Sequence, residues 1–398
     1  MATEAQRAPS KTELLIAALS FRAPEIALAR LAGLSPDEWA GLLPWTDRKR
    51  LTLQLFSRLE PYPLAAEVRE AFETRREKNR RRLALLRNEA SKVLATLQAA
   101  GLRASILKGF TLAPSFVPNL ELRQQYDLDL YLTRDDALRA HQLLQSRGSY
   151  ALDLDNEERA NHLPALIPKS GWEWRGDFFD LEIPIAVELH FRLWNPEFEC
   201  IALTYPEPHE SQAGQLASIV LHLMRHIFHG NVTASHVYEL SYFLEHHFDD
   251  MEFWREWREW RVSDPVLQDL STAAFAIAAR VFGARLPELP ISKPVAAWVR
   301  RFGPTVLAQD RAGKSQLLLQ LTFLRSWKDR FRMLRRRLLP LNMPPAVDGV
   351  YLTPEQLTFA RRVKQARRQV GFVAGRVWYH AHSLFGFLRA WALWRWGL

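Results

Sequence analysis

The sequence predicts an α+β fold, in which a small mixed β-sheet is flanked by an N-terminal and a C-terminal helical region. Short apolar runs with alternating polar positions at 104–107, 126–133 and 186–191 are typical of strands. Before and after them, apolar residues recur every three or four positions, which is typical of amphipathic helices. We therefore divide the chain into an N-terminal helical segment (1–63), a sheet-containing core (64–205), a helical domain (206–339), and a linker with a basic, aromatic helix (340–398).

The first 100 residues are predicted to be helical. Residues 11–60 are expected to form short helices divided by four prolines, namely Pro24, Pro36, Pro44 and Pro61. Ser35 is a preferred N-cap because Pro36 and two acidic residues follow it. A long helix is predicted over 64–100, ended by Gly101. Its basic residues are expected to form a solvated face: Arg75, Arg76, Lys78, Arg80, Arg81 and Arg82.

The remaining elements follow from the same periodicities. A helix over 135–147 is predicted to connect the second and third strands, and residues 172–181 to add a hairpin strand. After residue 211 the pattern predicts helices at 212–228, 235–247, 251–261, 264–282, 293–302, 313–336 and 354–396. The proline-rich stretch Pro340–Pro345 is the clearest linker.

The most informative motif is Asp127-Leu128-Asp129. Side chains alternate between the two faces of a strand, so Asp127 and Asp129 point one way while Leu128 points into a core. Two neighbouring carboxylates repel each other, and a divalent cation relieves that repulsion. The motif therefore indicates either a metal-binding strand or a solvated strand face.

A third carboxylate is found on the predicted strand at 186–191. Val187 and Leu189 share one face of it, while Glu188 and His190 share the other. If this strand pairs beside the Asp127 strand, three carboxylates meet, which is enough to hold two metal ions for phosphoryl or nucleotidyl transfer. The alternative is that Glu188 pairs with a neighbouring base such as Arg192.

These motifs together resemble the uncharacterised nucleotidyltransferase family of the DNA polymerase β-like superfamily. The resemblance spans about residues 10–260 and depends on the following residues: Leu107-Lys108-Gly109, Arg123, Asp127-Leu128-Asp129-Leu130, and Val187-Glu188-Leu189-His190-Phe191. It implies transfer of a nucleoside monophosphate from a nucleoside triphosphate (NTP), dependent on Mg²⁺ or Mn²⁺. It also implies that Asp127, Asp129 and Glu188 are the catalytic, metal-binding residues.

The resemblance further implies that Lys108, Gly109 and Arg123 bind the nucleotide. Most members of the superfamily have Gly-Ser or Gly-Gly where this chain has Lys108-Gly109. Gly109 still permits close backbone approach, and Lys108 supplies a charge suited to phosphate. Arg123 is expected to meet the triphosphate in a forked contact, or else to pair with Asp127 or Glu121.

Histidine and cysteine patterns indicate no further chemistry. His222 and His226 share a helix face, but the metalloprotease pattern His-Glu-x-x-His is absent, so packing histidines are the favoured interpretation over pocket contacts. The chain has one cysteine, Cys200, which excludes an internal disulfide and suits a reducing cytosol. With no secretory signal visible at the N-terminus, a cytoplasmic location is expected.

Positive charge is concentrated at the C-terminal end. The chain has a formal net charge of +9, and its basic excess lies entirely in residues 291–398. Residues 361–398 are basic and rich in tryptophan, which suits peripheral contact with an anionic membrane, contact with nucleic acid, or packing on the body. Of the two external partners, the membrane is favoured over nucleic acid. A transmembrane span is not expected because arginines interrupt the apolar run.

Three functional classes follow. The first is a nucleotidyltransferase whose acceptor is a sugar, an antibiotic, a protein side chain or an RNA end. The second is a non-catalytic nucleotide-sensing or scaffold protein that docks through its basic tail. The third is an enzyme, similar to an antitoxin, that modifies another protein with AMP. All three proposed carboxylates are present, which favours catalysis.

Overall fold

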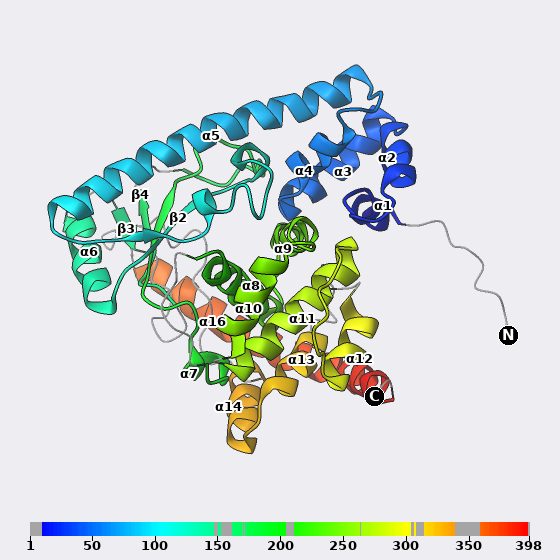
Figure 1. Cartoon of the computed structure of the whole chain (residues 1–398). Helices are drawn as coiled ribbons and strands as arrows, with labels where there is room; N and C mark the ends of the chain where they lie inside the picture. The colour runs from blue at the N-terminus through cyan, green and yellow to red at the C-terminus, as the bar shows by residue number, and fades with distance from the viewer. Residues whose placement is uncertain are drawn as a thin grey trace.

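The computed structural model confirms the α+β class: a small mixed sheet lies beneath one long helix, with helical regions on both sides in sequence (Figure 1). The structure describes residues 10–146, 150–152, 161–168, 170, 172–203, 211–262, 264–303, 306–307, 314–338 and 359–396. The proposed linker Pro340–Pro345 lies outside these residues. The domain boundaries drawn from the sequence remain a prediction.

The N-terminal region consists of four short helices and one long one: α1 (Lys11–Ala18), α2 (Glu25–Ala32), α3 (Pro36–Lys49), α4 (Thr52–Leu59) and α5 (Ala66–Ala99). Ser35 caps α3 as expected, since its hydroxyl accepts a hydrogen bond from the Glu38 amide at 3.3 Å. The prediction that Pro44 breaks the chain was wrong, because Pro44 lies inside α3. Buried side chains on both sides, Leu43 and Thr46, hold this helix against the body despite the missing amide.

The sheet has five strands in the order β1-β2-β5-β4-β3. Their bounds are β1 (Ser105–Ile106), β2 (Asp127–Tyr131), β3 (Tyr150–Leu152), β4 (Leu166–Pro168) and β5 (Ala186–His190). β2 and β5 are parallel, and the other pairs are antiparallel. The Asp127 strand and the Glu188 strand are therefore neighbours, which is the condition that the sequence left open.

The two faces of the sheet differ in character. Leu128, Leu130 and Val187 point into a buried core with the second half of α5 and with α6 (Arg134–Ser146). In Figure 1 α5 runs above the sheet, whereas the C-terminal helices lie below it. The polar face of β2 and β5 is thus left for Asp129, Glu188 and their neighbours.

The C-terminal region is helical as expected. Its helices are α7 (Pro196–Glu199), α8 (Gln212–His229), α9 (Ala234–His246), α10 (Met251–Val262), α11 (Pro265–Phe282), α12 (Lys293–Phe302), α13 (Ser315–Phe323), α14 (Trp327–Leu338) and α16 (Phe359–Arg395). The single helix predicted over 313–336 was wrong. The chain is extended at Leu324, and the Ser326 hydroxyl accepts a hydrogen bond from the Lys328 amide at 3.1 Å, so that a new helix begins there.

The predicted hairpin strand at 172–181 was also wrong, because this segment is a loop. Side chains in the segment replace the hydrogen bonds that a strand ladder would provide. Trp172 Nε1 donates to Asp180 Oδ2 at 2.9 Å, and the Phe179 amide donates to Asp177 Oδ1 at 2.8 Å. Such local bonds from Asp compete with regular secondary structure.

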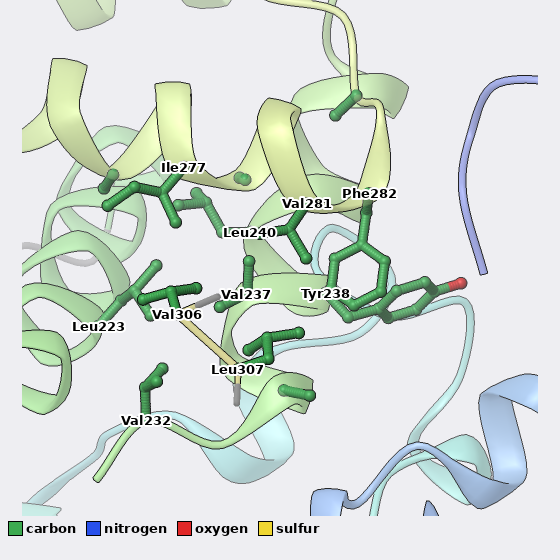
Figure 2. Close-up of a cluster of buried hydrophobic side chains, with 14 of the residues drawn as sticks. Leu223, Val232, Val237, Tyr238, Leu240, Ile277, Val281, Phe282, Val306 and Leu307 are labelled. Carbon is green, nitrogen blue, oxygen red and sulfur yellow. The ribbon is translucent and has the colours of Figure 1, made fainter. Parts of the chain in front are cut away.

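One large hydrophobic core joins the N-terminal and C-terminal helices. It contains Leu15 of α1, Phe72 of α5, Leu223 of α8 and Phe275 of α11. Figure 2 shows part of it, where α8, α9 and α11 meet. Within the described residues, no helix has a stretch both long and apolar enough to cross a bilayer.

One member of the basic run on α5 is not solvated. Arg82 is 5% exposed, and its guanidinium donates to the carbonyl oxygens of Gln125, Tyr126 and Ile183. These carbonyls lie just before β2 and β5. The neighbouring Asn79 side chain donates to Glu121 O at 2.7 Å and to Arg123 O at 3.2 Å. α5 therefore fixes the point where both carboxylate-bearing strands begin.

We expect Phe72→Ala to lower the free energy of unfolding by about 3–5 kcal/mol, because a fully buried ring is replaced by a cavity. The Phe72 ring stacks on Phe56 at 4.9 Å and meets Trp39 edge-on at 5.1 Å. Urea unfolding followed by fluorescence measures the change. The control is Leu85→Ala, an exposed position on the same helix, which should change stability by less than about 0.5 kcal/mol. Equal stabilities for the two variants would contradict this account of the core.

Candidate active site

The parallel pairing of β2 and β5 sets the positions of the acidic side chains. Asp129 lies directly opposite Glu188, and Asp127 lies opposite Ala186. Residues opposite each other on adjacent strands point to the same face, so the carboxylates of Asp129 and Glu188 are neighbours. Asp127 precedes Asp129 by two positions and shares that face.

His190 joins these acids into a compact cluster. Its Nε2 lies 2.8 Å from Asp129 Oδ1 and 3.3 Å from Glu188 Oε2. One ligand atom from each of the three residues lies within 4.8 Å of the others. The Glu188 carboxylate also lies 3.6 Å from His162 Nε2. Oxygen and imidazole donors at this spacing can hold a divalent cation.

The cluster is held ionised by its neighbours. Burial opposes ionisation of Asp129, but the charge of Lys108 and the hydrogen bond from His190 keep its pKa well below the usual range. Burial also opposes ionisation of Glu188, and the two nearby histidines, His162 and His190, lower its pKa despite this. Conversely, burial disfavours the charged form of His190, while its bonds to Asp129 and Glu188 raise its pKa.

Asp127 has a different environment from Asp129. Burial and the negative charges of Asp129 and Glu188 raise the pKa of Asp127 to about 6. Asp127 does not belong to the group of three potential metal ligands formed by Asp129, Glu188 and His190. The structure therefore brings Asp129 and Glu188 into direct proximity, with Asp127 as an adjacent carboxylate. A nearby positive charge would stabilise the ionised form of Asp127.

The Lys108-Gly109 loop connects β1 to the polar face of the sheet. Lys108 Nζ lies 3.6 Å from Asp129 Oδ2, and its side chain is 11% exposed. Both residues have positive φ, +50° for Lys108 and +54° for Gly109. Non-glycine residues rarely adopt this conformation, and such strain clusters at functional sites. The turn that follows, Gly109–Thr111, is a single 3₁₀ turn rather than a full helix.

Gly109 cannot be replaced without displacing a neighbour. A Cβ at this position would lie 2.4 Å from Gln125 Nε2. That Nε2 donates to the Asp127 carbonyl oxygen at 2.8 Å. Gly109 therefore allows Gln125 to fix the start of β2, in addition to any role in approaching a phosphate.

Arg123 pairs with neither Asp127 nor Glu121, the two partners that the sequence offered as the alternative to a triphosphate contact. Its Nε donates to Glu239 Oε1 of α9 at 2.9 Å, and both side chains are largely buried. Burial opposes its charge, while Glu239, Asp127 and Asp129 together raise its pKa. Arg123 thus stays charged next to the carboxylates and ties the sheet to the helical domain.

A cavity with basic and aromatic walls lies to one side of these residues. It is lined by Asp47, Arg75, Lys78, Trp174 and Phe179, among others. None of the six residues proposed from the sequence lines it. Two of its basic groups are already paired, Arg75 with Asp47 at 2.9 Å and Lys78 with Asp177 at 2.8 Å. We therefore place the candidate site at the carboxylates instead.

The predicted helix face of His222 and His226 lies on α8, and His236 of α9 completes a group of three histidines. Burial, reinforced by nearby positive charge, lowers the pKa of His226 to about 3 and holds the pKa of His222 and His236 well below its ordinary value. The sequence indicated the spacing of the first two residues but not the third.

Comparison with protein families matches residues 35–277, more than half of the chain, to the uncharacterised nucleotidyltransferase family. Searches of curated proteins and of solved structures found no significant match. The family match includes the Lys108-Gly109 loop, β2, β5 and the acidic cluster. The sheet geometry and the family match agree, and the chain belongs to the uncharacterised nucleotidyltransferase family.

Proposed function

We propose that this protein transfers a nucleoside monophosphate from an NTP to a hydroxyl-bearing acceptor, with Mg²⁺ or Mn²⁺ held by Asp127, Asp129 and Glu188. The observation that supports this most strongly is the register of β2 and β5, which puts Asp129 opposite Glu188. Carboxylates are the ligands that Mg²⁺ and Mn²⁺ prefer. Bound there, the cations would neutralise charge on the triphosphate and on the attacking oxygen.

The residues around the carboxylates divide the remaining tasks. Lys108 offers its ammonium group to the β- and γ-phosphates, and Gly109 leaves its backbone open for their approach. Arg123 contributes a buried positive charge that acts on Asp127 and Asp129. His190 orients the carboxylates of Asp129 and Glu188 through its hydrogen bonds.

In the proposed reaction an acceptor hydroxyl oxygen bonds to the α-phosphorus of the NTP. The bond from that phosphorus to the bridging oxygen breaks, and pyrophosphate leaves. Glu188, partly accessible at the edge of the cluster, accepts the hydroxyl proton. This assignment makes Glu188 a catalytic residue and Lys108, Gly109 and Arg123 nucleotide-binding residues. We propose a cytoplasmic location, in keeping with NTP as the donor.

We expect Asp127→Asn with Asp129→Asn to abolish transfer and Mg²⁺-dependent nucleotide binding without unfolding the chain, because the amides keep the shape but lose the charge. Calorimetry with ATP, CTP, GTP and UTP, with and without Mg²⁺, measures binding and identifies the donor. The matched control is Asp135→Asn, an exposed carboxylate at the start of α6. Full transfer activity in the double variant would refute the assignment, and a wild type that binds no nucleotide would support the scaffold alternative.

We expect Gly109→Ala to weaken NTP binding by at least about 10-fold, through the clash with Gln125 and the positive φ. Gln125→Ala in the same chain removes the clash. If Gly109 is needed for the phosphates to approach the backbone, the double variant still binds NTP weakly. If the double variant binds NTP as the wild type does, Gly109 is needed only for packing against Gln125. Gly41→Ala is the control, since a Cβ there meets nothing within 4 Å.

We also propose peripheral membrane contact through residues 361–398. The last turns of α16 pack on the body through Phe387, Ala390 and Trp394, whose Nε1 donates to Pro294 O at 3.0 Å. An adjoining arc of the same helix carries apolar side chains that stay exposed, namely Leu384, Phe385, Leu388 and Trp391, and Trp396 just after the helix is exposed too. Basic helices with exposed aromatic residues suit an anionic lipid interface.

We expect the wild-type protein to sediment with vesicles of phosphatidylserine and phosphatidylcholine, and less so as salt concentration rises. Phe385→Ser with Trp391→Ser should abolish sedimentation because both side chains belong to the exposed arc. Trp174→Ser removes an exposed aromatic elsewhere and serves as the control. A wild type that stays in the supernatant, or binds pure phosphatidylcholine equally well, would contradict the membrane proposal.

A further inference from the structure

Three histidines converge at the junction of α8 and α9, and none of them belongs to the carboxylate cluster of β2 and β5. His222 and His226 are one turn apart on α8, and His236 projects from the first turn of α9. The ring centroids are 4.4 Å, 4.8 Å and 4.9 Å apart. One ring nitrogen from each lies within 4.8 Å of the other two. Few packing arrangements require three imidazoles to face one another.

The hydrogen bonding of His226 and His236 leaves on each residue a ring nitrogen lone pair that a metal ion could accept. His226 Nδ1 lies 2.9 Å from Asn231 Oδ1, an acceptor, so this nitrogen carries the proton and Nε2 keeps its lone pair. His236 is 9% exposed, and its buried Nδ1 has no hydrogen-bond partner. A buried polar atom without a partner is costly, and an ion bound at this nitrogen would remove that cost.

Four basic side chains act on the three rings: Arg50, Lys108 and Arg123 on His236, and Arg225 on His222 and His226. Two of them are neutralised, Lys108 by Asp129 at 3.6 Å and Arg123 by Glu239 at 2.9 Å, and Arg50 lies over the Tyr126 ring. The helices that carry the rings are firmly packed. Leu223 of α8 and Val237 and Leu240 of α9 are fully buried, and Figure 2 shows them within the core. The donor positions are therefore held in place by the fold.

We propose that His222, His226 and His236 form a three-histidine site for a Zn²⁺-type transition metal ion. Imidazole nitrogen suits zinc and its neighbours in the first transition series, whereas Mg²⁺ prefers oxygen ligands. The site would thus select a different ion from the carboxylates of the proposed active site. With three protein ligands, the fourth tetrahedral position is open to water or to an oxygen of a bound molecule. Asn231 acts as the positioning residue that orients His226.

The test uses the full-length protein without a polyhistidine tag, stripped of metal by a chelator. Co²⁺ alone is then titrated and followed by its visible absorption, and Zn²⁺ is added to displace it. We expect one Co²⁺ per chain with a nitrogen-ligand spectrum, and loss of that spectrum in His236→Ala. Asn231→Ala keeps all three ligands and should bind about 10–100-fold more weakly. His246→Ala, an exposed histidine of α9, should bind as the wild type does.

Several results would overturn the proposal. One is a wild type that gives no stoichiometric Co²⁺ spectrum, and another is equal loss in His246→Ala. Loss of the ion in Asp127→Asn with Asp129→Asn would assign it to the carboxylates instead. Binding of inorganic phosphate without metal would make the cluster an anion site. If His236→Ala fails to fold, two other measurements still test the proposal: weaker metal binding by Asn231→Ala, and a rise in the melting temperature of the wild type when metal is added. None of these readouts depends on nucleotidyl transfer, so failure here is distinct from failure of the proposed function.

Discussion

The candidate site depends on one constraint: two carboxylates, the buried Asp129 and the half-buried Glu188, lie side by side on adjacent parallel strands. Such a pair is unfavourable unless charge and hydrogen bonds offset it. The structure supplies both kinds of compensation. Lys108, in the loop before β2, contributes a positive charge, and His190 hydrogen-bonds to both acids. From α5, Arg82 donates hydrogen bonds to the backbone just before β2 and β5. The two acids thus explain why the elements around them carry paired or strained polar groups rather than apolar ones.

Much of the fold could be predicted from the sequence because it depends on local periodicity. The long helix α5 and the strands that carry Asp129 and Glu188 match their apolar patterns closely. Tyr150–Leu152 and Leu166–Pro168 were missed, since strands of three residues are too short to show a period of two. The segment 172–181 shows the reverse error. A strand was predicted there, but Asp177 and Asp180 accept local hydrogen bonds and the segment forms turns instead.

The site was predictable only as far as the strands carry it. Alternation placed Asp127 and Asp129 on one face, and Glu188 and His190 on another strand's polar face, without any knowledge of tertiary structure. Contacts between distant segments could not be seen in this way. Arg123 contacts Glu239, 116 positions away, and Arg82 is buried although Arg80 and Arg81 beside it in the sequence are exposed. For His190 the signal was present, because it shares a face with Glu188. Its role as a bridge became visible only with the register of β2 and β5.

The continuity of α5 has a mechanical consequence. It is one uninterrupted helix of 34 residues, about 50 Å long. Its first half is clamped by the N-terminal helices through Phe72, and its middle holds the strand entrances through Asn79 and Arg82. Because one continuous helix makes both sets of contacts, a displacement of α1–α4 by a binding partner would be transmitted along α5 to the backbone that carries the carboxylates. The N-terminal segment therefore helps to position the site as well as burying the core, and its removal would leave the first half of α5 without its packing partners.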